Sequence, residues 1–216
     1  MSLCLLCETR KPKRFCPATR GDICTQCCGA EREVTVDCPL DCEYLREARK
    51  HDKPVPLTED MVPHPDVRVT EAFLERNREL VTFLSFSLFE SAMETPGATD
   101  ADIREGLGAL IKTYKTLDSG LIYETRPANP YADSIQQRLR ARVEQLKQRL
   151  LEQSGVHTLR DNDVLGVLVF LDRLALMYNN GRRRGRAYLS VLYDSYAEAA
   201  AANAQQPPEG PSLIAP

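Results

Sequence analysis

Residues 4–42 have the sequence CLLCETRKPKRFCPATRGDICTQCCGAEREVTVDCPLDC, which contains all eight cysteines of the 216-residue chain. The cysteines stand at Cys4, Cys7, Cys16, Cys24, Cys27, Cys28, Cys38 and Cys42. Because no cysteine follows residue 42, the chain divides into a small cysteine-rich module, residues 1–50, and a larger part that needs no cysteine. All eight cysteines are candidate metal ligands, since thiolates are common zinc ligands.

The spacing of these cysteines indicates zinc. A segment of about 50 residues buries too little apolar surface to fold without additional stabilisation by disulfides or bound metal ions. Two residues separate Cys4 from Cys7, and two separate Cys24 from Cys27. This spacing lets both thiolates of a pair reach one ion about 2.3 Å away. We see no secretory signal at the start of the chain, and disulfides rarely persist in a reducing compartment. Disulfides and an iron–sulfur cluster remain the alternatives.

Eight thiols suit two zinc ions with four ligands each. In an interleaved arrangement, the first site contains Cys4, Cys7 and Cys24 with either Cys27 or Cys28. The second site contains Cys16, Cys38 and Cys42 with the other member of the Cys27–Cys28 pair. One alternative is a single zinc ion, with the surplus cysteines buried as apolar residues. His51 is a further candidate ligand, although it lies nine residues past Cys42.

The module resembles two groups of proteins. Its spacing is similar to that of cross-brace zinc fingers of the MYND and HIT types, which mediate protein–protein contacts. The positions near their pattern are Cys16, Cys24, Cys28, Cys38 and Cys42. Thr19 stands where those fingers have a ligand cysteine. The strings ICxxCCG at residues 23–29 and CPxDCxYL at residues 38–45 also look like the N-terminal module of a group of uncharacterised bacterial proteins. That resemblance implies zinc and a bacterial cytoplasmic setting, and it implies no reaction.

The expected metal is structural rather than catalytic. A site with four thiolate ligands is closed, whereas a catalytic zinc keeps an open position and commonly has histidine or carboxylate ligands. Within the module, the sequence VTV at residues 34–36 alternates as a short strand does. Residues 42–50 are predicted to form a closing helix.

The remainder of the chain is predicted to be a bundle of about five helices, so the fold class is mostly α. Four prolines in residues 51–66 exclude a helix there and predict an extended linker. Apolar residues then recur at helical spacing through residues 67–204. The expected helices cover residues 69–93, 99–119, 130–154, 161–178 and 183–202. Residues 205–216 are predicted to be a disordered tail.

Composition excludes several classes of protein. The formal net charge is -3, so the whole chain lacks the basic footprint of a nucleic-acid-binding protein. The longest strongly apolar stretch, residues 80–89, is much shorter than the roughly 20 residues of a membrane span. We therefore expect a cytoplasmic protein without a membrane partner. We recognise no glycine-rich phosphate loop, Glu-x-x-His pair or Ser/His/Asp arrangement, and we expect no enzyme.

The predicted function is binding, by an adaptor or regulator whose zinc module presents a surface to another protein. The alternative is a nucleic-acid-binding regulator with two basic groups, Arg10, Lys11, Lys13 and Arg14, and Arg182, Arg183, Arg184 and Arg186. Against it, residues 1–53 have a net charge of roughly -3 once eight thiolates and two zinc ions are counted. We interpret the second basic group as a solvated turn whose cations stabilise the end of the preceding helix. A redox sensor that releases zinc on oxidation is a third hypothesis.

Overall fold

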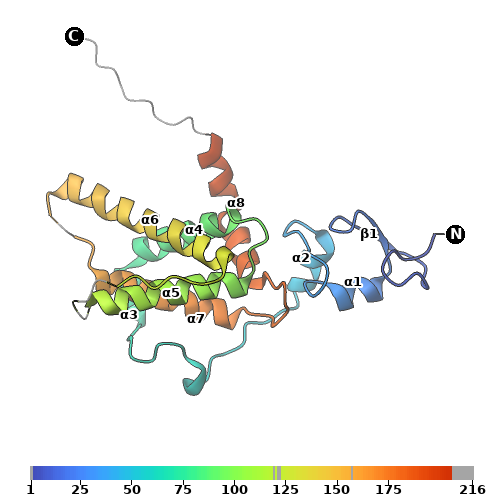
Figure 1. The fold of residues 1–216 in the computed structure, drawn as a ribbon, viewed down its shortest axis with the longest axis horizontal. Helices are drawn as coiled ribbons and strands as arrows, with labels where there is room; N and C mark the ends of the chain where they lie inside the picture. The colour runs from blue at the N-terminus through green and yellow to red at the C-terminus, as the bar shows by residue number, and fades with distance from the viewer. Residues whose placement is uncertain (1, 119, 121–122, 157, 206–216) are drawn as a thin grey trace, which may run out of the picture.

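The computed structural model describes residues 2–118, 120, 123–156 and 158–205. Figure 1 shows the cysteine-rich module at one end of the molecule and a helical body at the other. The module contains β1 (Arg14–Cys16), β2 (Gly21–Ile23), α1 (Thr25–Glu31) and α2 (Glu43–Arg49). After the 3-10 helix η1 (Glu59–Met61) come α3 (Glu71–Arg76), α4 (Arg78–Met93), α5 (Asp100–Asp118), α6 (Pro130–Ser154), α7 (Asp161–Met177) and α8 (Ala187–Gln205). The predicted mostly-α fold class is confirmed. The predicted tail lies outside the described residues, apart from Gln205.

The module is built on a small hairpin that the sequence analysis missed. Strands β1 and β2 pair antiparallel, with Phe15 opposite Asp22. The amide of Leu5 donates to the carbonyl oxygen of Asp22 (3.0 Å), which ties the N-terminal loop to the hairpin. The buried hydrophobic residues of the module are Cys4, Cys16, Ile23, Cys24, Cys27, Val36, Cys38 and Leu45. Five of these eight are cysteines, so the interior of the module consists largely of sulfur.

The strand predicted at residues 34–36 is wrong. The amides of Val34, Thr35 and Val36 all donate to one acceptor, the carbonyl oxygen of Glu31, at 3.0–3.2 Å. This turn follows α1 directly, and Glu33 within it has a positive φ of 54°. Alternating valines therefore form a turn here, because their backbone donors are satisfied locally rather than by a neighbouring strand. The closing helix predicted at residues 42–50 is present as α2.

The helical body packs α5 against α6 and α7, and α4 against α6, α7 and α8. Helix α7 has nine buried residues. Helices α5 and α6 approach closely at Gly106, where an added Cβ would lie 2.9 Å from the carbonyl oxygen of Ala132. The start of α5 is capped by reciprocal hydrogen bonds. The backbone amide of Thr99 donates to the Asp102 carboxylate (2.8 Å), and the Asp102 amide donates to the Thr99 hydroxyl (3.4 Å).

Two helix boundaries differ from the prediction. The helix expected over residues 69–93 is interrupted at Asn77, so that α3 and α4 are separate. The side-chain amide of Asn77 donates to the carbonyl oxygen of Phe73 (3.0 Å), and such local bonds compete with helical ones. Helix α8 begins at Ala187 rather than near residue 183, because the preceding residues form a loop that contacts the module.

The proline-rich segment, residues 51–66, contains no α-helix. It is tied to α7 rather than free, since the amide of Val55 donates to the carbonyl oxygen of Met177 (2.8 Å). The guanidinium of Arg173 donates to the carbonyl oxygens of Pro63 (3.1 Å) and His64 (2.8 Å). Across the part of the chain that the structure describes, no helix combines the length and the apolar character needed to cross a membrane.

Candidate metal centre

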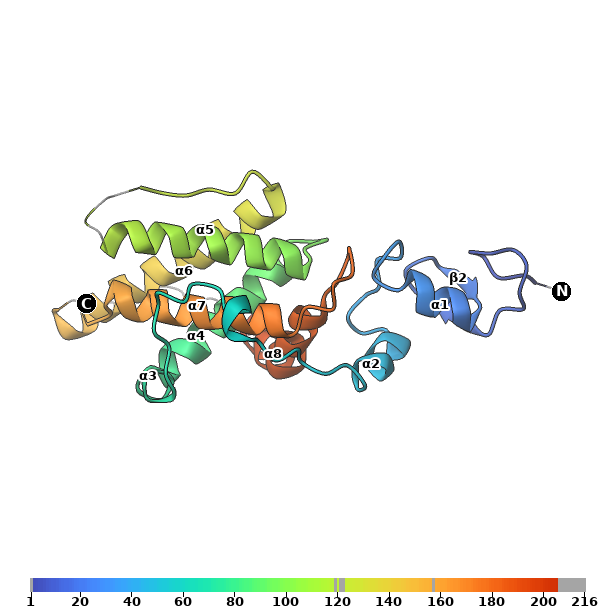
Figure 2. The same cartoon turned by 90° about the horizontal axis from the view of Figure 1, so that it is seen from below.

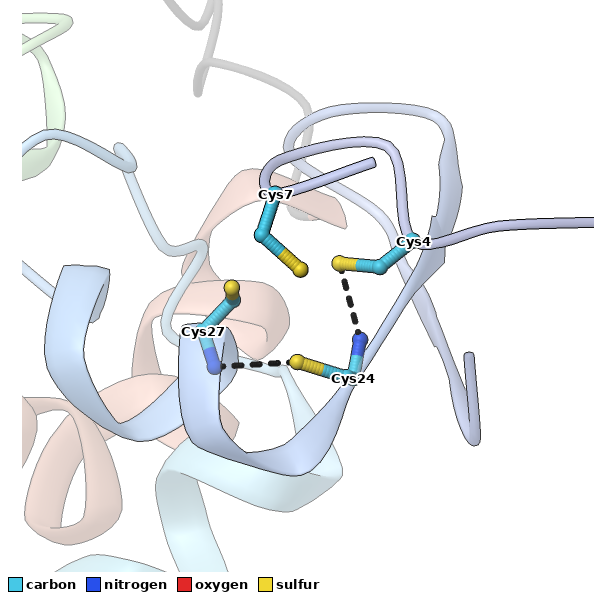
Figure 3. Close-up of side chains that lie close together, drawn as sticks. All are labelled: Cys4, Cys7, Cys24 and Cys27. Atoms are coloured by element: carbon cyan, nitrogen blue, oxygen red, sulfur yellow. Dashed lines mark hydrogen bonds between the residues drawn. The ribbon is translucent and has the colours of Figure 1, made fainter. Parts of the chain in front are cut away.

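Four cysteines from three segments converge in the module. Cys4 and Cys7 lie in the N-terminal loop, Cys24 follows β2, and Cys27 lies in α1. Figure 3 shows their four sulfur atoms around a common centre. These sulfur atoms all lie within 4.8 Å of one another. In a tetrahedral zinc site with bonds of 2.3 Å, the sulfurs lie about 3.8 Å apart, so this group can hold one metal ion after a small contraction.

Backbone amides orient these sulfur atoms. The amide of Cys24 donates to the sulfur of Cys4 (3.2 Å), and the amide of Cys27 donates to the sulfur of Cys24 (3.4 Å). Cys24 is thereby also the N-cap residue of α1. The amide of Glu8 donates to the carbonyl oxygen of Cys4 (2.8 Å) and closes the turn between Cys4 and Cys7. Hydrogen bonds of this kind favour thiolates over thiols, and thiolates are the form that binds metal.

The same contacts shift the pKa values of the thiols. Hydrogen bonds from Thr9 lower the pKa of Cys7 to about 5, and the amide of Cys27 lowers the pKa of Cys24. The hydrogen bond to Cys24 and then burial raise the pKa of Cys27. The last proton is the hardest to remove because the new charge would lie beside existing thiolates. A divalent cation supplies the missing counter-charge, so metal binding and loss of this proton are coupled.

The other four cysteines lie around a second space in the module. Cys16, Cys28, Cys38 and Cys42 all border one cavity of about 20 Å³, together with Arg14 and Tyr44. A cavity needs roughly 10–15 Å³ to hold one water molecule. The guanidinium of Arg14 lies 3.5 Å from the sulfur of Cys28 and 4.5 Å from the centre of the Tyr44 ring. Among the described residues, the first group alone brings its ligand atoms within 4.8 Å of one another.

The adjacent residues Cys27 and Cys28 belong to different groups. Cys27 lies with Cys4, Cys7 and Cys24, whereas Cys28 borders the second cavity. Neighbouring positions on an α-helix point about 100° apart, so one turn of α1 faces both spaces. His51 is exposed and belongs to neither group. All eight cysteines are free thiols in the structure.

Comparisons of the chain with protein-family models, with curated proteins and with solved structures found no match. The case for a metal therefore rests on the geometry of the cysteines. The resemblances to cross-brace fingers and to bacterial cysteine-rich modules stay predictions.

The structure adds a buried acid that the sequence analysis did not single out. Glu33 is 2% exposed, and its carboxylate lies between the module and the helical body. It forms an ion pair with Arg49 of α2 and accepts hydrogen bonds from the side chain of Asn180 (2.9 Å) and the amide of Arg186 (2.8 Å). Its carbonyl oxygen accepts from the amide of Arg184 (2.8 Å). We call these contacts the Glu33 junction.

The basic group at residues 182–186 takes part in this junction. Arg182 donates to the carbonyl oxygens of Arg32 and Gly29. Arg186 forms an ion pair with Asp37 (2.6 Å) and donates to the carbonyl oxygen of Cys38 (3.3 Å). The interpretation of the whole group as a solvated turn is therefore wrong for these two arginines. Nothing in the local charge pattern distinguishes a cation that binds the module from one that binds water.

Proposed function

We propose that this protein is a zinc-stabilised adaptor or regulator whose cysteine-rich module contacts another protein. The convergence of Cys4, Cys7, Cys24 and Cys27 is the observation that carries the proposal. Leu5 and Leu6 lie between two of these ligands and are 53% and 38% exposed. A metal at this site would therefore fix a turn that displays apolar side chains. Such side chains at the end of the molecule farthest from the helical body favour a protein contact.

The proposal includes a second structural zinc ion, held by Cys16, Cys28, Cys38 and Cys42. Their common cavity supports it, because eight thiols then form two closed four-thiolate sites. The proposal also includes a bacterial cytoplasmic setting, which the resemblance of the module supports and in which free thiols persist.

Native mass spectrometry should find two zinc ions per chain. The variant Cys16→Ser should retain about one ion, because a site with three thiolates binds zinc more weakly than a site with four. Cys4→Ser, the matched change in the first group, should also retain about one. A single ion in the wild-type protein that Cys16→Ser leaves in place would contradict the second site.

The surface formed by Leu5 and Leu6 is tested with the double variant Leu5→Asp, Leu6→Asp. Both side chains are exposed, so the module should fold and keep its zinc while it loses its protein partners in affinity capture. The matched control is Val156→Asp, which places the same charge at an exposed apolar position of the helical body. Equal recovery of the same partners by all three proteins would exclude this surface as the contact.

Nucleic-acid binding is the competing function. Arg182 and Arg186 are half-buried and bind the module, and Arg14 contacts Tyr44 and Cys28, so fewer cations are left to contact a phosphate backbone. We therefore expect no binding of DNA or RNA oligonucleotides by fluorescence anisotropy, even at about 50 mM salt, where phosphate contacts are strong. Tight binding that weakens steeply with added salt would support the competing function instead.

A further inference from the structure

A crevice of about 530 Å³ separates part of the module from the helical body. One wall consists of α2 and the residues that follow it, and the other consists of the end of α7 and the start of α8. Figure 2 shows α2 and α8 on the two sides of the boundary between the module and the helical body. Small-molecule sites commonly have volumes of about 300–1,000 Å³ and often lie between domains. None of the eight cysteines lines this crevice.

The wall formed by α2 is positively charged. Arg46, Arg49, Lys50 and Lys53 line the crevice, against the two carboxylates of Asp52 and Asp194. Lys50 is paired with Glu47 at the surface. In the part of the chain that the structure describes, Arg46 and Lys53 form no ion pair within 4.0 Å. The excess of cations favours a negatively charged occupant.

Arg49 is the most buried of these four cations. Its side chain is 11% exposed, and one of its terminal nitrogens pairs with Glu33. Its Nε and its other terminal nitrogen, Nη1, are buried and have no hydrogen-bond partner among the described residues. A buried charged donor without a partner costs free energy, because water has been removed and nothing replaces it. These two donors lie on different edges of the planar guanidinium and are closed to solvent, so they do not form a bidentate site. The cations open to the crevice are Arg46, Lys50 and Lys53.

The opposite wall is mainly uncharged. Tyr178, Ala187 and Val191 present aromatic and apolar surface, and Asn180 and Ser190 add polar groups. Tyr178 is held in place by the ring of Tyr188, which stacks on it with ring centres 6.5 Å apart. Apolar walls with a few convergent polar groups are typical of sites for small organic molecules.

We propose that this crevice binds a small organic anion of about the size of a mononucleotide. Its phosphate or carboxylate group pairs with the exposed cations Arg46 and Lys53, and its uncharged part lies against Tyr178 and the start of α8. The ligand contacts both the module and the helical body, so binding strengthens their association. The inference uses neither the cysteines nor the exposed leucines, and it stands or fails independently of the proposed function.

The test is calorimetric titration of the full-length, zinc-loaded protein with adenosine monophosphate, ribose 5-phosphate and benzoate, with adenosine as the uncharged control. At least one anionic probe should bind and raise the melting temperature, whereas adenosine should bind at least about tenfold more weakly. Binding by the two phosphates alone would identify phosphate as the anchoring group, and binding by benzoate alone would identify carboxylate.

Two charge reversals locate the site. Arg46→Glu and Lys53→Glu should each lower the affinity for the anionic probe by about tenfold, since each replaces an attraction with a repulsion at short range. Both residues are exposed, so the variants should fold as the wild-type protein does. Lys13→Glu, at an exposed position outside the crevice, is the matched control and should bind normally. Failure of every anionic probe, or equal affinity in all three variants, would overturn the inference.

Discussion

Chelation of the metal is expected to unfold residues 1–50 while the helical body stays folded. The module has eight buried residues in its interior, and five of them are cysteines. The helical body has 24 buried residues in one continuous cluster. Structural zinc supplies about 10–16 kcal/mol to a module of this kind, which exceeds what three buried aliphatic side chains contribute. Circular dichroism should retain most of its helical signal, since α1 and α2 have seven residues each.

Limited proteolysis locates the unfolded part. After chelation, new cleavage should occur within residues 1–50, and added zinc should reverse it. Cys24→Ser should show the same cleavage without a chelator, because Cys24 both borders the candidate metal and caps α1. Thr25→Ala, an exposed neighbour, is the control and should resist cleavage. A chelated protein with an unchanged cleavage pattern would show that the metal does not hold the module together.

Glu33→Ala is expected to lower the free energy of unfolding by about 3–5 kcal/mol. Among the described residues, Glu33 is the only partner of the Arg49 guanidinium, and the Arg49 side chain is 11% exposed. The change removes that partner and leaves the amide of Arg186 and the side chain of Asn180 without their acceptor. A buried charge without a partner is far more costly than a lost surface ion pair. Thermal denaturation measures the loss. Hydrogen exchange should become faster at residues 29–38 and 179–187, on both sides of the Glu33 junction.

Two further variants test how much of this loss of stability comes from the buried charge of Glu33. Glu33→Gln keeps one acceptor oxygen, which can serve Arg186 and Arg49 at the position of Oε1 but not Asn180 at the position of Oε2. Its loss of stability should therefore be smaller than that of Glu33→Ala. Glu47→Ala breaks an ion pair with Lys50 in which both side chains are more than half exposed, and it should cost at most about 1 kcal/mol. Equal losses for Glu33→Ala and Glu47→Ala would mean that the junction contributes little.

In the helical body, the spacing of apolar residues predicted most helix boundaries correctly but not all of them. Apolar spacing and caps placed α5, α6 and α7 within about two residues of their ends. The pattern failed at Asn77, which divides the predicted first helix. There the backbone leaves the helical conformation, and both the backbone amide and the side-chain amide donate to the carbonyl oxygen of Phe73. It failed again at residues 34–36, where three amides share the carbonyl oxygen of Glu31. In both cases the backbone found its partner within five residues, and hydrophobic spacing does not record such bonds.

The candidate metal centre was predicted in outline. Cys-x2-Cys spacing identified Cys4, Cys7 and Cys24 as members of one group, and the structure adds Cys27 rather than Cys28. That choice depends on the rotation of α1 about its axis, which the packing of the module decides. The basic group at residues 182–186 was misinterpreted for a related reason. The sequence around a charged residue does not show which partner it binds, and the partners of Arg182 and Arg186 are 148–153 residues away in the chain.

The sequence by itself determined that this is a mostly-α protein with a separate cysteine-rich module, because helical periodicity and cysteine spacing are local properties of the chain. Only the tertiary structure decided how the two parts are joined. The buried Glu33, the arginines that reach the module, and the cationic crevice beside α2 are formed by segments distant in sequence. The physical reason is that burial turns ordinary surface charges into directed contacts, and burial depends on the packing of the whole chain.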